Sequence, residues 1–228
     1  MTLRAADLAA VQRLPLFSSV PHSVSARVLK TARLHHFATG SVLFREGEPA
    51  DWLYCTLDCH VVLKAKNGNG QESIIEFVPP GQPFIVAAVL LDRPFLMTAQ
   101  VVETSRVLLI PAADFRRALE TDLALAAALN RVSAEHWRGL IGQIKSLKMR
   151  TAAQRLAAFL ISLVDKRDGE ASVHLPCERR VLAAWLGMVP TSASRAFRDL
   201  AAMGVEGRGR TLRIQSLDRL IEFADMNF

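Results

Sequence analysis

The chain has 228 residues, half of them hydrophobic and 22% charged, a composition that supports a buried core and excludes a wholly disordered protein. Its longest uninterrupted apolar run, residues 84–91, is much shorter than the ~20 residues of a membrane-spanning helix. The N-terminal residues lack the basic and apolar regions of a signal peptide. We therefore expect a cytoplasmic protein with no membrane partner.

The three cysteines, Cys55, Cys59 and Cys177, are too few for a disulfide scaffold. A closed metal site needs four ligands at short spacing, and the one Cys-x3-Cys pair does not supply them. We expect reduced, structural thiols and no metal.

Positive charge is concentrated near the C-terminus. The net charge is +6, and residues 179–213 contain seven arginines but only two acidic side chains, Asp199 and Glu206. Such a cluster suits a polyanionic partner. An ordinary solvated face is the alternative that charge alone leaves open.

The N-terminal part of the chain is predicted to be all-β. Short runs of β-branched and aromatic residues alternate with Gly and Pro turns, a pattern typical of a barrel or sandwich. Asn67-Gly68 predicts a hairpin with a type I′ turn. The predicted strands are residues 41–44, 52–57, 60–66, 73–78, 98–103 and 106–111.

From about residue 114 to 147 the pattern changes to that of one long helix without Pro. Two apolar stripes follow it, and one has the heptad spacing of a coiled-coil seam. One stripe can cover the barrel while the other meets the same helix of a second copy; a helix buried on two sides within a monomer is the alternative. The predicted seam is Leu123, Ala126, Asn130, Ser133, Trp137, Leu140, Ile144 and Leu147, and the predicted barrel-facing stripe is Leu125, Leu129, Val132 and His136.

The C-terminal third predicts a helix at residues 151–164, followed by helices at 178–186 and 190–203. Gly187 lies in the tight turn between the last two, and Pro190 suits the first position of a helix. This is the helix-turn-helix pattern, whose second helix enters the major groove. A turn at residues 207–210 and a strand at 211–215 predict a small wing. The inward residues are Ala193, Phe197, Leu200 and Ala201, and the candidate DNA-binding residues are Thr191, Ser192, Ser194, Arg195, Arg198, Arg208 and Arg210.

Three stretches in this order resemble the cyclic AMP receptor protein and fumarate–nitrate regulator (Crp/Fnr) superfamily of bacterial transcription factors. They are ATGSVLFREGEPADWLY (38–54), SLKMRTAAQRLAAFL (146–160) and LGMVPTSASRAFRDLAAMG (186–204). The resemblance implies an α+β fold with three parts. These are an effector-sensing, cupin-like double-stranded β-helix (β-roll) at residues 1–112, a dimerisation helix at 113–148 and a winged helix-turn-helix at 149–228. It also implies a homodimer that binds a palindromic operator in double-stranded DNA and contacts RNA polymerase.

On the recognition helix, Ser194 and Arg195 match the family's Ser-Arg pair. A glutamate commonly lies three residues before that serine, and here the position is Thr191. The change removes a carboxylate that could accept a hydrogen bond from cytosine N4. DNA binding is expected to persist with a different half-site.

In the sensor, the resemblance argues against the best-known ligands. Nucleotide-binding members carry Phe-Gly-Glu and Arg-Ser/Thr-Ala, and the matching stretches are Phe84-Ile85-Val86 and Met97-Thr98-Ala99. Burying a phosphate without a cation would cost several kcal/mol, which argues against cyclic AMP. The absence of cysteine before Cys55 argues against an iron–sulfur cluster. Cys59 replaces a usual glycine, and in such a turn it could be strained.

The remaining expectation is an apolar effector pocket. Some relatives without the nucleotide anchors resemble haem-dependent sensors of nitric oxide or carbon monoxide, so haem stays an open hypothesis, with His136 as its candidate ligand. The alternative to a haem ligand is that His136 is an ordinary hydrogen-bonded or exposed side chain. The candidate pocket residues are Phe84, Val86, Val89, Leu90, Phe95, Met97, Thr98 and His136.

The leading function is a dimeric transcription regulator controlled by an effector of unknown identity. Two other functional classes are the alternatives. A ligand-sensing or scaffold module that binds a protein partner would leave the arginine cluster unused. An enzyme could use His174 and Cys177, but no third orienting residue accompanies them, so we expect no catalysis.

Overall fold

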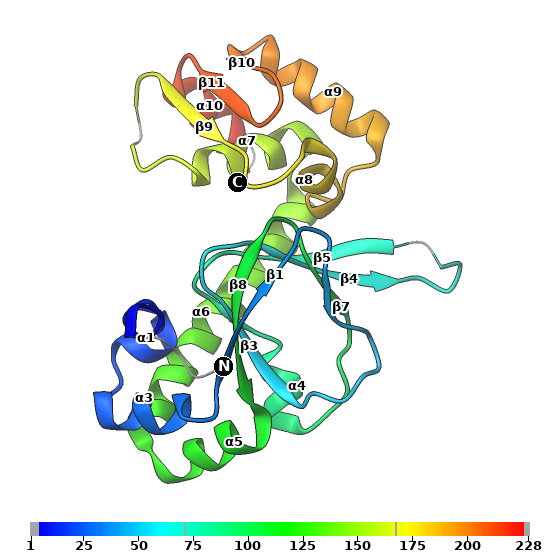
Figure 1. Cartoon of the computed structure of the whole chain (residues 1–228). Coiled ribbons are helices and arrows are strands. Elements are labelled where there is room, and N and C mark those ends of the chain that lie inside the picture. The colour runs from blue at the N-terminus through cyan, green and yellow to red at the C-terminus, as the bar shows by residue number, and fades with distance from the viewer. Residues whose placement is uncertain (1–4, 71, 167, 226–228) are drawn as a thin grey trace. The chain divides into compact units, whose positions relative to one another are not determined.

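The computed structural model describes residues 5–70, 72–166 and 168–225 (Figure 1). The chain forms two compact units, Met1–Trp137 and Arg138–Phe228, and the boundary between them lies within the long helix α6 (Leu123–Met149). Each unit is described by itself.

The first unit begins with three short helices, α1 (Ala5–Gln12), α2 (Pro15–Ser18) and α3 (His22–Leu29). Pro15 is the first residue of α2, where its missing N–H costs no hydrogen bond. Phe17, Val24 and Val28 are buried in the core of the unit. The expectation of an all-β N-terminal part is therefore wrong for residues 5–29, since helices this short show almost no periodic pattern.

Two four-stranded antiparallel sheets follow, with strand orders β1-β8-β3-β6 and β2-β7-β4-β5. All six predicted strands are present. Two others were missed, because β1 contains the polar pair His35-His36 and β6 has only two residues. The strands are β1 (Arg33–Phe37), β2 (Val42–Phe44), β3 (Trp52–Thr56), β4 (Val61–Lys66), β5 (Glu72–Val78), β6 (Pro83–Phe84), β7 (Thr98–Val101) and β8 (Ser105–Pro111).

The β4–β5 hairpin is confirmed, but its predicted turn type is wrong. Among the described turn residues the positive φ belongs to Gly70 (φ 77°), not to Asn67 or Gly68. The Asn67 side chain accepts a hydrogen bond from the backbone N–H of Asn69 (3.0 Å), and Gly70 N–H donates to the Asn67 carbonyl (2.9 Å). Asn67 therefore starts an Asx turn in a longer loop.

The predicted single helix from residue 114 is two helices, α5 (Ala112–Thr121) and α6. The break is at Asp122, whose backbone is extended (φ −137°, ψ 107°). Its carboxylate accepts a hydrogen bond from the N–H of Leu125 at 3.0 Å, which caps the start of α6. An aspartate cap inside an apolar pattern is easily overlooked when only the periodicity is counted.

The described residues of the second unit form the C-terminal part of α6, four further helices and a three-stranded sheet of order β10-β11-β9. A capping box of Thr151 and Gln154 starts its first helix, α7. In Figure 1 its strands lie to one side of α7 and α9 to the other. The sequence did not predict β9, β10 or α10. The elements are α7 (Ala152–Ser162), β9 (Ala171–His174), α8 (Arg179–Trp185), α9 (Pro190–Ala201), β10 (Val205–Glu206), β11 (Thr211–Ile214) and α10 (Leu217–Asp225).

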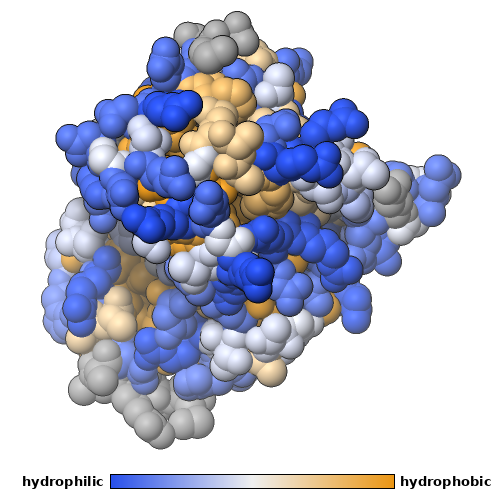
Figure 2. All heavy atoms as spheres, turned by 90° about the horizontal axis from the view of Figure 1, so that it is seen from above, coloured by the Kyte–Doolittle hydropathy of each residue, from blue (hydrophilic) through white to orange (hydrophobic). Residues whose placement is uncertain are grey.

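The expected α+β fold class is confirmed: antiparallel sheets, a long helix and a winged helix-turn-helix follow one another. Hydrophilic side chains cover most of the face shown in Figure 2, and apolar ones appear there mainly in hollows between them. None of the described helices is long and apolar enough to cross a membrane.

Candidate functional site

The turn between α8 and α9 has the geometry of a helix-turn-helix. Gly187 adopts φ 68°, and the N–H of Met188 donates to the carbonyl of Ala183 at 2.9 Å. From α7, the guanidinium of Arg155 donates to the carbonyls of Leu186 (2.8 Å) and Gly187 (3.4 Å). Burial lowers the pKa of Arg155. Arg155 was not predicted from the sequence, because a helix arginine that caps another helix leaves no local pattern.

Helix α9 presents a polar face to solvent. Thr191, Ser194, Arg195 and Arg198 are exposed, and Ser192 is half-buried. These five residues lie where the sequence placed them.

The inward face of α9 needs one correction. Leu200 and Ala193 are buried as expected and Phe197 is half-buried, but Ala201 is exposed and Ala196 is buried instead. Residues 193, 196 and 200 follow the three- and four-residue helical spacing. Position 201 lies one residue beyond that stripe, so it turns away from the core.

The arginines of the cluster divide into two groups. The side chains of Arg180, Arg195, Arg198 and Arg208 are exposed and make no hydrogen bond or ion pair with another described residue. These side chains are available to an external polyanion.

The other three arginines are engaged within the unit. Arg213 pairs with Glu170 (2.7 Å), and this hydrogen bond lowers the pKa of Glu170. Arg210 donates through Nε to the carbonyl of Leu175 (2.8 Å), so it connects the wing to the end of β9. Arg179 donates to two carbonyls of the wing loop. The phosphate role expected of Arg210 is thus not open to its Nε, and the sequence did not predict the contacts of Arg179 with the wing loop.

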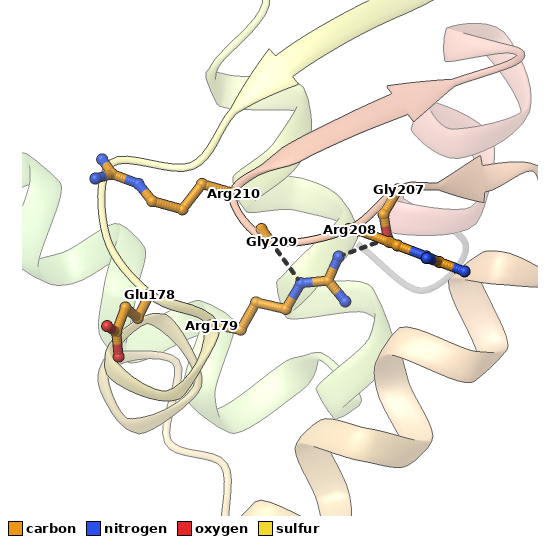
Figure 3. Close-up of a pocket in the computed structure, with 6 residues that line it drawn as sticks. All are labelled: Glu178, Arg179, Gly207, Arg208, Gly209 and Arg210. Atoms are coloured by element: carbon orange, nitrogen blue, oxygen red, sulfur yellow. Dashed lines mark hydrogen bonds between the residues drawn. The ribbon is translucent and has the colours of Figure 1, made fainter.

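The wing is the β10–β11 hairpin, and its tip requires glycine. Gly207 has φ 150°, and a Cβ atom there would lie 2.2 Å from the carbonyl oxygen of Thr211. The loop lines a hollow (Figure 3). The guanidinium of Arg179 lies beside both Gly207 and Gly209, and the side chain of Arg210 points away from that of Arg208. Arg208 is left at the tip of the wing.

The predicted seam of α6 lies largely in solvent. Leu123 is 89% exposed and Trp137 64%, and Asn130, Ile144 and Leu147 are also exposed. Leu140, Ala126 and Ser133 are half-buried. Ile141 is exposed as well, and the sequence did not single it out. Large apolar side chains gathered along one helix are typical of an interaction surface.

The other stripe of α6 is buried at Leu125, Leu129 and Val132, as expected. His136 differs, because its side chain is 47% exposed and its Nδ1 lies 3.5 Å from the carboxylate of Glu76 on β5. Burial raises the pKa of Glu76, and His136 opposes that rise. The structure therefore shows His136 as a partly exposed partner of a carboxylate.

The aromatic candidates for an effector pocket fill space inside the roll. Phe95 stacks on Phe44 with ring centroids 3.8 Å apart, and Phe84 lies 5.7 Å from Tyr54. Burial of Tyr54, with Glu48 and Asp51 nearby, raises the pKa of Tyr54 to about 12.

The remaining pocket candidates differ in burial. Val89 is fully buried, whereas Leu90 faces solvent. Val86, Met97 and Thr98 are half-buried, and Thr98 accepts a hydrogen bond from the N–H of Glu46 at 3.0 Å. The structure thus brings Phe84 and Phe95 together and does not bring Leu90 to them.

The segment between these aromatic residues is the helix α4 (Val86–Leu91), which is bounded by two left-handed residues. Ile85 has φ 57° and Asp92 has φ 51°. A positive φ costs a β-branched residue more than any other. Arg116 of α5 holds the helix, donating to the carbonyl of Val89 (2.9 Å) and pairing with Asp92 (3.0 Å). Ile85 stands where the resemblance places a glycine, so the strain falls within the nucleotide-binding motif.

The cysteines are not paired in disulfides and are all buried. Burial raises the pKa of Cys55 to about 12 and also raises the pKa of Cys59. The idea that Cys59 strains a turn is wrong, because among the described residues only Ile85 and Asp92 combine a side chain with a positive φ. His174 lies 3.3 Å from the Thr211 hydroxyl at the edge of the wing sheet.

A sensor-type roll followed by a winged helix with unpaired arginines defines the class of DNA-binding regulators. Family models of the cyclic nucleotide-binding domain and of the Crp-like helix-turn-helix domain match residues 34–122 and 154–223. The chain belongs to the Crp/Fnr superfamily of bacterial transcription factors. It is a transcriptional regulator with an effector-binding domain and a helix-turn-helix domain.

Individual relatives cover most of the chain. A CRP-like cAMP-activated global transcriptional regulator of Mycobacterium tuberculosis is 22% identical over 91% of this chain and 95% of its own length. The nitrogen fixation regulation protein FixK of Bradyrhizobium diazoefficiens is 25% identical over 82% and 81%. The structure of FixK2 from Bradyrhizobium japonicum superimposes with a TM-score of 0.73, at 23% identity over 85% and 97%.

Proposed function

We propose that this protein is a cytoplasmic homodimer that reads a palindromic operator with two α9 helices and acts on transcription through RNA polymerase. The observation that carries the proposal is the set of exposed, unpaired arginines, Arg195 and Arg198 on α9 and Arg208 on the wing. Arginine can grip guanine O6 and N7, or a phosphate oxygen. A scaffold without DNA binding would leave these charges without a partner.

Dimerisation is supported by the exposed apolar face of α6. Burying side chains such as Leu123, Trp137 and Ile144 against a second copy would remove this face from water. The exposed Asn130 in the same stripe can set the register of the pair. In this arrangement residues 1–112 form the sensor, 113–148 the dimer helix and 149–228 the DNA-binding part.

The effector is proposed to differ from cyclic AMP, although the mycobacterial relative is named for activation by that nucleotide. The family's glutamate and arginine anchors correspond here to Val86 and Met97, which carry no charge to hold a ribose or a phosphate. The apolar side chains at these positions favour an apolar effector, and haem is one candidate. Effector binding would act by shifting the population of DNA-binding conformations.

The test uses the full-length protein and a duplex that it selects from a pool of randomised palindromes. Arg195→Ala should weaken binding to that duplex by about 10- to 100-fold, because a bidentate base contact is lost. Arg219→Ala, which removes one positive charge from the exposed side of α10, is the matched control and should bind as the parent does. Fluorescence anisotropy measures binding and sedimentation velocity measures the oligomeric state. Unchanged binding by Arg195→Ala would contradict the role of Arg195, and a purely monomeric parent bound to DNA would contradict the dimer.

A further inference from the structure

Arg179, the first residue of α8, connects three elements of the second unit, which are α8, the wing loop and α9. Its Nε donates to the carbonyl of Gly209 at 3.0 Å and its Nη2 to the carbonyl of Gly207 at 2.9 Å. The guanidinium carbon Cζ of Arg179 lies over the ring of Phe197 on α9, 4.7 Å from the ring centroid. Figure 3 shows the side chain reaching from α8 between the two glycines.

The wing loop has a backbone conformation that favours glycine, and the carbonyls of Gly207 and Gly209 accept hydrogen bonds from Arg179. Gly207 (φ 150°) and Gly209 (φ 59°) both lie in the region that L side chains rarely adopt. A loop containing two glycines loses much conformational entropy when it is ordered. The two charge-assisted hydrogen bonds from Arg179 offset that cost.

We propose that Arg179 is a positioning residue for DNA recognition: it fixes the wing against the recognition helix and does not itself contact a phosphate. Two of its donors are used by wing carbonyls and one of its faces by Phe197, whereas the side chain of Arg208, between the two glycines, has no partner among the described residues. Arg179 therefore sets where Arg208 stands, and Arg208 makes the contact with DNA. The inference rests on the proposed DNA-binding function.

The first experiment needs no DNA. Hydrogen–deuterium exchange of the free protein is measured on peptides that cover residues 205–214 in Arg179→Gln, Arg208→Gln and the parent. Arg179→Gln should speed exchange in these peptides by about tenfold, since the loop loses both hydrogen bonds. Arg208→Gln should leave exchange unchanged. Equal exchange in all three proteins would overturn the proposal.

The second experiment is a double-mutant cycle on the duplex selected by the parent, with affinity measured as a function of salt. Each lost phosphate contact lowers the slope of log K against log salt by about 1 and weakens binding by about tenfold near 0.1 M salt. Arg208→Gln and Arg179→Gln should each show this loss. The double variant should show no more than one loss, because Arg179 acts through the position of Arg208. Additive losses in the double variant would identify Arg179 as a second, independent phosphate contact and overturn the proposal.

Arg179→Lys separates charge from geometry. Lysine keeps the positive charge but cannot bridge two carbonyls and stack on an aromatic ring at once. It should therefore stay close to Arg179→Gln in both experiments, whereas full recovery of affinity would indicate a simple phosphate contact. If the parent selects no duplex, the proposed function fails, and the exchange experiment still decides whether Arg179 orders the wing.

Discussion

The second unit and the β-roll differ in how far they keep the residues that the family uses for its functions. On α9, Ser194 and Arg195 match the family pattern. Both are exposed, and the side chain of Arg195 forms no ion pair with another described residue. In the roll, Val86 and Met97 replace charged anchors, and Ile85 occupies a left-handed backbone position where relatives carry glycine. The comparison teaches that the positions proposed to read DNA keep the family's residues at 194 and 195, whereas the positions that hold a nucleotide in other members are altered.

In the second unit, the largest effect on DNA affinity is expected from a substitution of Gly207. Gly207→Ala should lower DNA affinity by at least tenfold and reduce the stability of the second unit by about 2 kcal/mol or more, because its Cβ would overlap the Thr211 carbonyl. Anisotropy and thermal unfolding measure the two effects. Gly68→Ala, at a glycine with open space and no positive φ, is the control. A parent-like melting temperature and affinity in Gly207→Ala would refute the glycine requirement.

Thr191 is the one departure on the recognition helix. Thr191→Glu restores a carboxylate on the exposed face of α9 and should shift the preferred base at one half-site position toward a cytosine contact, by about tenfold. Selection from randomised duplexes, run in parallel with the parent, measures the shift. The same preferred half-site in both proteins would show that position 191 does not reach a base.

In the roll, Ile85 allows a test of strain. Ile85→Ala and Ile85→Gly remove nearly the same packing, but only glycine relieves the positive φ. Ile85→Gly should therefore be more stable than Ile85→Ala by about 1 kcal/mol, which reverses the usual order of these residues in a helix. Denaturant unfolding measures the difference. An alanine variant that is the more stable of the two would show that residue 85 does not hold a left-handed backbone.

The smallest expected effect concerns Glu76. Burial raises the pKa of Glu76, so the folded state favours its protonated form. Its contribution to stability is thus complete at low pH and is lost as the pH rises through the raised pKa. Glu76→Gln should melt slightly above the parent at pH 8 and match it near pH 4. A parent that gains stability relative to Glu76→Gln as the pH rises would contradict this sign.

Much of the fold could be predicted because the relevant signals are local. The six predicted strands are runs of β-branched and aromatic residues between Gly and Pro turns, and Pro190 indicated the start of α9. The missed elements carry weaker signals: β6 has two residues, and α1 to α3 are four to eight residues long. The break at Asp122 was missed because one polar cap interrupts the stripe without changing its period.

In the proposed DNA-binding site, too, the features with local sequence signals were predicted and the long-range contacts were not. The exposed positions of α9 follow from helical periodicity, so the exposure of Thr191, Arg195 and Arg198 was predicted correctly. The contacts of Arg155 and Arg179 with other elements were not predicted, because the carbonyls that accept these hydrogen bonds are 28 to 32 residues away in the chain. No sequence pattern indicates which backbone carbonyl a long side chain will reach.

The sequence by itself determined the order of sheet, long helix and winged helix, together with the polar face of the recognition helix, since these depend on hydrophobic period and turn residues. Only the tertiary structure decided which arginines are free. Arg179 and Arg210 are held by carbonyls of the folded wing region, whereas Arg195, Arg198 and Arg208 are not. The physical reason is that all five carry the same charge, and the fold alone places an acceptor within reach of some and not of others.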